Sequence, residues 1–324
     1  MQRDVKEDEM KCYPVAVLMC ALIAGPVTGQ SVTSTPAVSK NDEFPDKPEL
    51  LRRIGLYETA ARHAEEAHTL DGRLVSVYLN LGGMYEVAAM YPRAEDAIAR
   101  AISLIRSGVK GDLPQALLAM GSLHVGMGEF RKAERDENEA LRLQEAADDR
   151  KGMAQSWGYL AATYFKEKKY DQAIDDGQRA MHLLGSAPHT DAVDRIAVRQ
   201  TLANAYCMLG DCERGLPLLR ESLEIAKTAY GEDSPPAALA YYLLGYTSWR
   251  AGDRVGAQAM ERGLRGMKGT LGWGHPVYVQ AMKNYALFLR ESGQVAMAGR
   301  VEGEVRQAEA VVDARTFTHL PTMR

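Results

Sequence analysis

The chain has 324 residues, of which 46% are hydrophobic, and 39 basic against 43 acidic side chains give a net charge of −4. This composition is sufficient for a continuous buried core. The near-balanced charge argues against nucleic acid as a partner, because phosphate backbones select an excess of basic residues.

The N-terminal segment has the features of an export signal. Lys11 precedes an apolar run at residues 15–24, and small residues follow up to Gly29. Such a run is typical of a cleaved signal peptide and is shorter than the roughly 20 residues that span a membrane. We therefore predict a signal peptide at residues 1–29, an exported (periplasmic or secreted) protein and no membrane span in its mature form. The alternative is a buried N-terminal helix of a cytoplasmic protein.

The rest of the chain divides into three segments. Residues 30–48 are rich in Ser, Thr, Pro and charge, which predicts a flexible linker. Helical periodicity then extends over residues 49–313, where residues 50–70 have the pattern of the second helix of a degenerate unit that precedes the first complete one. Residues 314–324 lose this periodicity, and we expect a disordered tail.

Pairs of small residues recur within the periodic segment at a spacing of twelve. The six pairs are Gly82 and Ala94, Gly121 and Ala133, Ala161 and Ala173, Ala203 and Gly215, Gly245 and Ala257, and Ala286 and Ala298. Successive pairs lie 39–42 residues apart, a period typical of stacked helical repeats. Two closely crossing helices leave room for little more than a methyl group, and a larger side chain would cost about 1–3 kcal/mol.

Each unit contains two amphipathic stretches joined by a turn. In the third unit Trp157, Leu160 and Tyr164 follow helical spacing before the turn, and Tyr170 and Ala180 do so after it. Glycines at the corresponding turns suit the left-handed residue that ends many helices. These turn glycines are Gly128, Gly210, Gly252 and Gly293.

The pattern Trp157-x2-Leu160-Ala161-x2-Tyr164, followed by Ala173 and Ala180, resembles the tetratricopeptide repeat. The segments before Pro235 and Pro276 resemble the kinesin-light-chain type of this repeat, which bacterial proteins also contain. The resemblance implies an all-α fold, a right-handed superhelical solenoid of about six antiparallel helix pairs. Two residues depart from the pattern, because Glu137 and Gly177 stand where large apolar residues are expected.

The resemblance also implies a concave groove lined by residues of the first helix of each pair. Tyr242, Tyr246, Trp249 and Arg250 would share one helical face there, and aromatic and Arg side chains dominate binding at interfaces. We expect this face to bind an extended, partly acidic peptide; packing against neighbouring units is the alternative for each aromatic residue. The further groove residues are Tyr159, Phe165, Lys166, Gln200, Asn204, Lys283, Asn284 and Arg290.

Cys207 and Cys212 flank the turn at Gly210 and are the only cysteines outside the N-terminal segment. A disulfide requires Cα atoms within about 7 Å, which a turn permits. The sequence therefore allows two alternatives, a disulfide formed in an oxidising compartment and a pair of inert, buried thiols.

No phosphate-binding loop, nucleophile elbow or metal-ligand spacing stands out in the sequence, so we predict no catalytic residue, cofactor or metal site. The predicted function is a non-catalytic scaffold that binds an extended peptide or a partner protein in its groove. The alternatives are a subunit of an envelope complex that binds a folded protein and a regulatory module of an enzyme.

Overall fold

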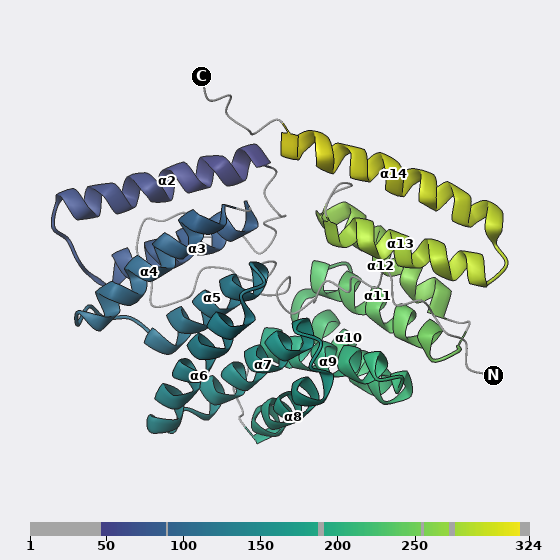
Figure 1. Cartoon of the computed structure of the whole chain (residues 1–324), viewed down its shortest axis with the longest axis horizontal. Coiled ribbons are helices and arrows are strands. Elements are labelled where there is room, and N and C mark those ends of the chain that lie inside the picture. The colour runs from purple at the N-terminus through teal and green to yellow at the C-terminus, as the bar shows by residue number, and fades with distance from the viewer. Residues whose placement is uncertain (1–46, 89, 187–190, 254–255, 272–275, 318–324) are drawn as a thin grey trace. The chain divides into compact units, whose positions relative to one another are not determined.

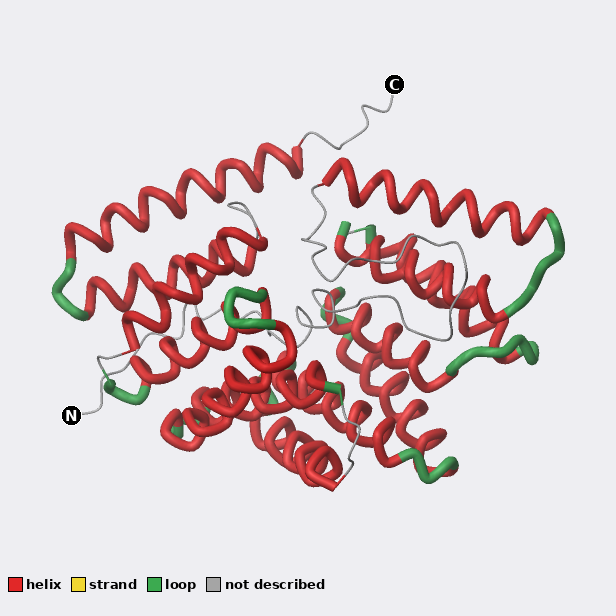
Figure 2. Tube along the Cα trace, turned by 180° about the vertical axis from the view of Figure 1, so that it is seen from behind, coloured by secondary structure: helices red, strands yellow, loops and turns green. Residues whose placement is uncertain are grey.

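The computed structural model describes residues 47–88, 90–186, 191–253, 256–271 and 276–317 (Figure 1). These residues form thirteen helices joined by short loops and contain no strand (Figure 2), which confirms the predicted all-α class. No helix among them has both the length and the apolar character needed to cross a bilayer. The predicted signal peptide and most of the predicted linker lie outside the described residues.

The described residues belong to two compact parts, which we call the N-terminal part (residues 47–225) and the C-terminal part (residues 226–317). The helices of the N-terminal part are α2 (Lys47–Glu66), α3 (Gly72–Val87), α4 (Tyr91–Arg106), α5 (Leu113–Gly126), α6 (Phe130–Ala146), α7 (Arg150–Lys166), α8 (Tyr170–Ser186), α9 (Ala192–Met208) and the beginning of α10 (Cys212–Tyr230). Those of the C-terminal part are α11 (Pro235–Arg250), α12 (Gly256–Leu271), α13 (Pro276–Glu291) and α14 (Val295–Phe317). Helix α14 thus extends beyond the predicted end of the array at residue 313.

Consecutive helices pack as pairs, as the repeat pattern predicts. In the N-terminal part α3 packs on α4, α5 on α6 and α7 on α8, and each second helix also contacts the first helix of the next pair. The first helices α3, α5, α7 and α9 contact one another in turn, whereas α4, α6 and α8 have no comparable mutual contact among the described residues. Closer spacing of the first helices makes their outer surface the concave side of this part. We call this surface the first-helix face.

The small-residue pairs lie where paired helices cross. Ala94, Ala133 and Ala161 are fully buried. A Cβ atom on Gly215 would come within 2.8 Å of the Ala203 carbonyl oxygen, which is closer than carbon side chains approach. The backbones therefore touch at the positions that the sequence keeps small, and only Ala257 of the six pairs is partly exposed.

The turns between paired helices repeat one conformation. Gly128, Gly210, Gly252 and Gly293 all have positive φ, between 76° and 88°. Lys168 has the equivalent position in the third unit and also adopts positive φ, 64°. A side chain makes this left-handed conformation unfavourable, so Lys168 carries a local strain that the glycines avoid.

Polar contacts join successive units near the end of each first helix. Tyr85 and Tyr164 each donate a hydrogen bond to a glutamate of the preceding second helix, Glu58 at 2.5 Å and Glu134 at 2.7 Å. His124 has the same position in the intervening unit, is buried, and lies 3.6 Å from the corresponding glutamate of α4. The three contacts tie α2, α4 and α6 to the helix pairs that follow them.

Replacing Ala161 by Leu should lower the free energy of unfolding by about 1–3 kcal/mol, because the larger side chain forces α7 and α8 apart. Urea unfolding followed by circular dichroism measures this change. Ala229→Leu, at an exposed position of α10, is the matched control and should change stability little. Equal effects of the two substitutions would contradict the close contact.

Replacing Lys168 by Gly should raise the free energy of unfolding by about 1 kcal/mol, because glycine adopts the left-handed conformation without strain. The reverse change at an equivalent turn, Gly210→Lys, should lower stability by a similar amount. Thermal and urea unfolding of both variants test the pair. A destabilised Lys168→Gly variant would show that the lysine side chain makes contacts that outweigh its strain.

Candidate functional site

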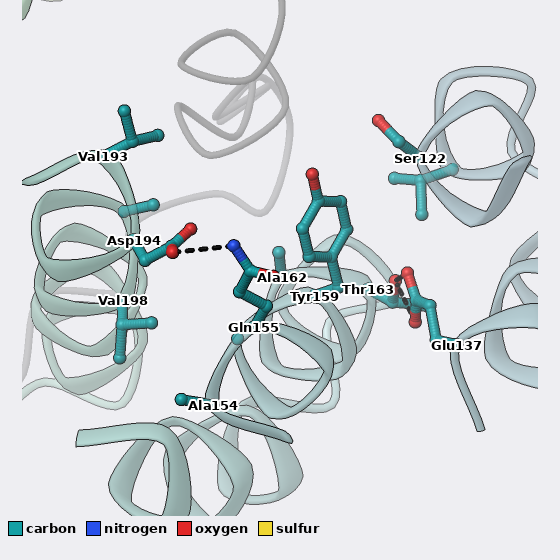
Figure 3. Close-up of a pocket in the computed structure, with 13 residues that line it drawn as sticks. Ser122, Glu137, Ala154, Gln155, Tyr159, Ala162, Thr163, Val193, Asp194 and Val198 are labelled. Atoms are coloured by element: carbon teal, nitrogen blue, oxygen red, sulfur yellow. Dashed lines mark hydrogen bonds between the residues drawn. The ribbon is translucent and has the colours of Figure 1, made fainter. Parts of the chain in front are cut away.

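A pocket opens in the middle of the first-helix face of the N-terminal part (Figure 3). Helices α5, α7 and α9 supply most of its wall, and one residue reaches it from α6. The lining residues are Ser122, Val125, Glu137, Ala154, Gln155, Gly158, Tyr159, Ala162, Thr163, Val193, Asp194, Ala197 and Val198. The pocket thus joins three successive units, as a groove for an extended ligand would.

Small residues make the pocket hollow. Gly158, Ala162 and Ala197 line the pocket, and their side chains are too short to fill it. A Cβ atom on Gly158 would come within 2.9 Å of Val198, so α7 and α9 approach closely below the pocket floor. The Tyr159 ring stands between two polar pairs, Gln155 with Asp194 on one side and Thr163 with Glu137 on the other (Figure 3).

Glu137 is a fully buried carboxyl group on a second helix, α6, and reaches the pocket between α5 and α7. The Thr163 hydroxyl lies 2.8 Å and 2.9 Å from its two carboxyl oxygens. Gly121 makes room for it, because a Cβ atom there would stand 2.9 Å from the Glu137 Cγ atom. The small residue that allows the helices to cross therefore also accommodates the acid.

Burial raises the pKa of Glu137 to about 8, against an ordinary value of 4.5. The Thr163 hydrogen bond lowers the pKa in part, while the nearby charges of Asp136 and Glu134 raise it further. None of the described residues lining the pocket is basic. Glu137 is thus a neutral acid at pH 7 in the absence of a ligand.

A second carboxyl group forms the opposite wall. Gln155 donates a hydrogen bond from Nε2 to Oδ2 of Asp194, at 2.9 Å. Burial raises the pKa of Asp194; the Gln155 hydrogen bond and, more weakly, the Lys151 charge oppose that shift, and Asp191 adds to it. Lys151 is itself paired with Asp191 at 2.9 Å, so its charge is largely balanced there.

A third carboxyl group, on α3, lies against the end of α5. A Cβ atom on Gly126 would stand 3.7 Å from Glu86 Oε1, and Gly126 follows Val125 of the pocket wall in the sequence. Burial alone raises the pKa of Glu86 to about 7. The first-helix face therefore carries three desolvated acids, Glu86, Glu137 and Asp194.

The predicted groove residues of the N-terminal part have different environments. Tyr159 lines the pocket, and Lys166 and Asn204 are partly exposed. Phe165 is buried and packs its ring 5.6 Å from Tyr170, and Gln200 is fully buried. Phe165 and Gln200 thus differ from the expected exposed positions, because closely spaced first helices cover side chains that point between them.

The predicted groove residues of the C-terminal part lie mainly against other helices. Tyr242 is buried, and its hydroxyl oxygen accepts a hydrogen bond from Asn284 at 2.9 Å. Arg250 is exposed, and Lys283 and Arg290 each form an ion pair with a glutamate of α14. Tyr242 therefore also differs from the expected exposed position, and Lys283 and Arg290 have carboxylate partners within the C-terminal part.

The predicted aromatic face of α11 does form, with an addition from α13. The Tyr242 and Tyr246 rings stack at 6.2 Å, and Trp249 meets Tyr246 edge-on at 5.6 Å. Phe288 extends the series, with its ring 5.8 Å from Trp249. These contacts favour packing between α11 and α13, the alternative that the sequence left open for each ring.

Cys207 and Cys212 meet across the turn at Gly210. Their Cα atoms are 3.9 Å apart, and the structure joins the two sulfur atoms. Both residues occur on one tryptic peptide, residues 200–214. We predict that this peptide is two hydrogen masses lighter before reduction than after it and resists alkylation until reduced. Alkylation of both cysteines without reduction, measured by mass spectrometry, would show inert thiols instead.

Known proteins share both the sequence pattern and the fold. Residues 194–262 match the tetratricopeptide repeat family. The TPR repeat-containing protein YpiA of Bacillus subtilis (strain 168) is 28% identical over 181 residues, which are 56% of this chain and 37% of YpiA. The chain thus spans less than two fifths of the length of this curated relative.

Three solved structures illustrate the likeness in fold. BtubC (BKLC) from P. vanneervenii has a TM-score of 0.51 at 20% identity, over 85% of this chain and 95% of its own. The apo form of RapI has a TM-score of 0.62 at 14% identity, over 82% of this chain and 93% of its own. The Rap conjugation gene regulator of the plasmid pLS20, in complex with the Phr* peptide, has a TM-score of 0.63 at 13% identity, over 86% of this chain and 73% of its own.

The paired helices, their small-residue crossings and the repeated turns define an all-α helical-repeat protein. The match to the tetratricopeptide repeat family covers residues 194–262, and the helix pairs outside it repeat the same crossings and turns. The resemblance inferred from the sequence is therefore confirmed, together with the fold that it implied.

The raised pKa of Glu137 predicts a pH-dependent stability. Between its ordinary value of 4.5 and about 8 the folded chain retains a proton that the unfolded chain has released. The corresponding stabilisation is complete below about pH 4.5 and is lost as the pH rises toward 8. Glu137→Gln cannot titrate, so its stability relative to the unchanged protein should increase over this interval.

Urea unfolding at several pH values between these limits measures the difference between the two proteins. Glu145→Gln, an exposed position on the same helix, is the control and should follow the unchanged protein. Other buried acids such as Glu86 remain in all three proteins and cancel in the comparison. Parallel curves for Glu137→Gln and the unchanged protein would contradict the buried neutral acid.

Proposed function

We propose that the chain is a non-catalytic scaffold whose first-helix face binds an extended peptide or a segment of a partner protein. The observation that carries the proposal is the pocket described above, because it is built by three successive units rather than by one. An extended chain crossing the helices would meet polar and apolar groups from each of them. Asn and Gln amides on such a face can bond to a ligand backbone, and Gln155 is placed at the pocket to do so.

The comparisons support this proposal at the level of the fold. Tetratricopeptide repeats are a protein-interaction fold, and the pLS20 regulator of similar fold is described in complex with the Phr* peptide. The likeness to that structure is 13% in sequence, so it supports the type of ligand and not its identity. A scaffold needs no reacting groups, and the raised pKa values on this face are explained by burial.

We also propose that the protein is exported by its N-terminal segment. The support is the basic residue Lys11 followed by the apolar run at residues 15–24 and the small residues before Gln30. N-terminal sequencing of the protein recovered from cells tests this. A mature protein that begins near Gln30 is the expected result, and a protein that retains residues 15–24 would contradict export by cleavage.

Selection from a random dodecapeptide library displayed on phage, with the full chain as target, tests the binding function. We expect enriched peptides to lose at least about tenfold in affinity for Tyr159→Ala, because half-buried aromatic residues contribute strongly to peptide recognition. Tyr241→Ala removes a partly exposed aromatic residue of the C-terminal part and should leave affinity unchanged. Absence of enrichment, or equal effects of both substitutions, would contradict a binding role of the first-helix face.

A further inference from the structure

When Glu137 is ionised, the pocket contains one hydrogen-bonding position that the described residues leave unfilled. Both oxygens of the Glu137 carboxyl group lie within hydrogen-bond distance of the Thr163 hydroxyl, which carries a single proton. In the ionised form of Glu137 that proton can reach only one of the two oxygens, and the other then has no donor among the described residues. Among the described residues no ion pair involves Glu137, although its side chain is fully buried and lines the pocket.

The surroundings of this carboxyl group are negative and apolar. The charges that act on Glu137 are those of Asp136 and Glu134, both acidic. Asp194 lies on the opposite wall, and Glu86 adjoins the wall at Gly126. Between the acids the lining is formed largely by alanine, glycine and valine side chains, which offer no compensating charge.

We propose that this pocket receives the long side chain of a lysine or arginine from the bound peptide, and that its charged end lies at Glu137. This proposal rests on the proposed function. The methylene stem would pack against Val125, Ala162 and Val198, as basic side chains commonly bury their stems on apolar surface. The charged end would donate to the Glu137 oxygen that Thr163 leaves unfilled. Glu86 and Asp194 would strengthen the attraction through their negative potential.

Other side chains fit this pocket less well. An acidic side chain would bring a fourth carboxyl group among Glu86, Glu137 and Asp194, which like-charge repulsion disfavours. An apolar side chain would fill the space but offer neither a charge nor a hydrogen-bond donor to the Glu137 carboxyl group. A cation satisfies both requirements, and its arrival favours the ionised form of Glu137 by lowering the pKa that burial has raised.

The peptides selected on the full chain provide the test. The proposal expects Lys or Arg to be enriched at one position, and replacement of that residue by norleucine to weaken binding at least about tenfold. Glu137→Gln should weaken the basic peptide by a similar factor and the norleucine peptide by less than about threefold. Glu145→Gln, an exposed position on α6, is the matched control and should bind both peptides as the unchanged protein does.

A pH series provides a second measurement. Affinity for the basic peptide should rise between about pH 6 and about pH 9 as Glu137 ionises, and this rise should be absent for norleucine and for Glu137→Gln. Asp136 and Glu134 on α6 and Asp194 on α9 also face this region, and His124 of α5 lies 2.7 Å from Asp136. These groups remain in Glu137→Gln, so this variant separates their effect from that of Glu137.

The outcomes distinguish the two proposals. If no peptide is enriched, or if enriched peptides bind Tyr159→Ala normally, the proposed function itself is wrong, and the cation site with it. If peptides bind and depend on Tyr159, but norleucine replaces the basic residue without loss, only the cation site is overturned. Equal weakening of both peptides by Glu137→Gln also overturns it, because that result indicates a general structural effect of the substitution.

Discussion

The close approach of paired helices at positions without large side chains is the constraint on which the rest of the structure depends. The buried Ala161 and Ala173 show the contact in the third unit, and the Gly215 position leaves no space for a Cβ atom. Close crossing brings the first helices into mutual contact, while the second helices remain apart. This difference in spacing gives the N-terminal part a face on which three successive helices can meet one ligand.

The pocket on that face shows how departures from the repeat pattern acquire a role. The apolar slot that Ile98 fills in the first unit contains Glu137 in the second and Gly177 in the third. Leu202 of α9 occupies the space beside Gly177, where a Cβ atom would stand 2.7 Å from its Cδ2 atom. One replacement is thus filled by a neighbouring unit, whereas the other places an acid in the interior.

The sequence was sufficient for the fold but only partly for the site. The small pairs and turn glycines predict the helix crossings and loops because they reflect local sterics, which each unit repeats. Exposure is different: Phe165, Gln200 and Tyr242 are buried because neighbouring helices cover them, and spacing within one helix does not contain that information. Glu137 belongs to a second helix, so a search confined to first helices misses it. The sequence does mark Glu137 in one way, because a glutamate stands where the repeat pattern predicts a large apolar residue.

The arrangement of Gly121 and Glu137 has a consequence for how this protein could be modified. The pocket and the helix crossing depend on the same two residues, since the acid occupies the volume that the glycine leaves empty. Transplanting the pocket into another repeat protein would therefore require the crossing as well as the lining residues. Conversely, replacing Gly121 by a larger residue to stabilise the helix crossing would displace Glu137, the acid that the neighbouring units lack.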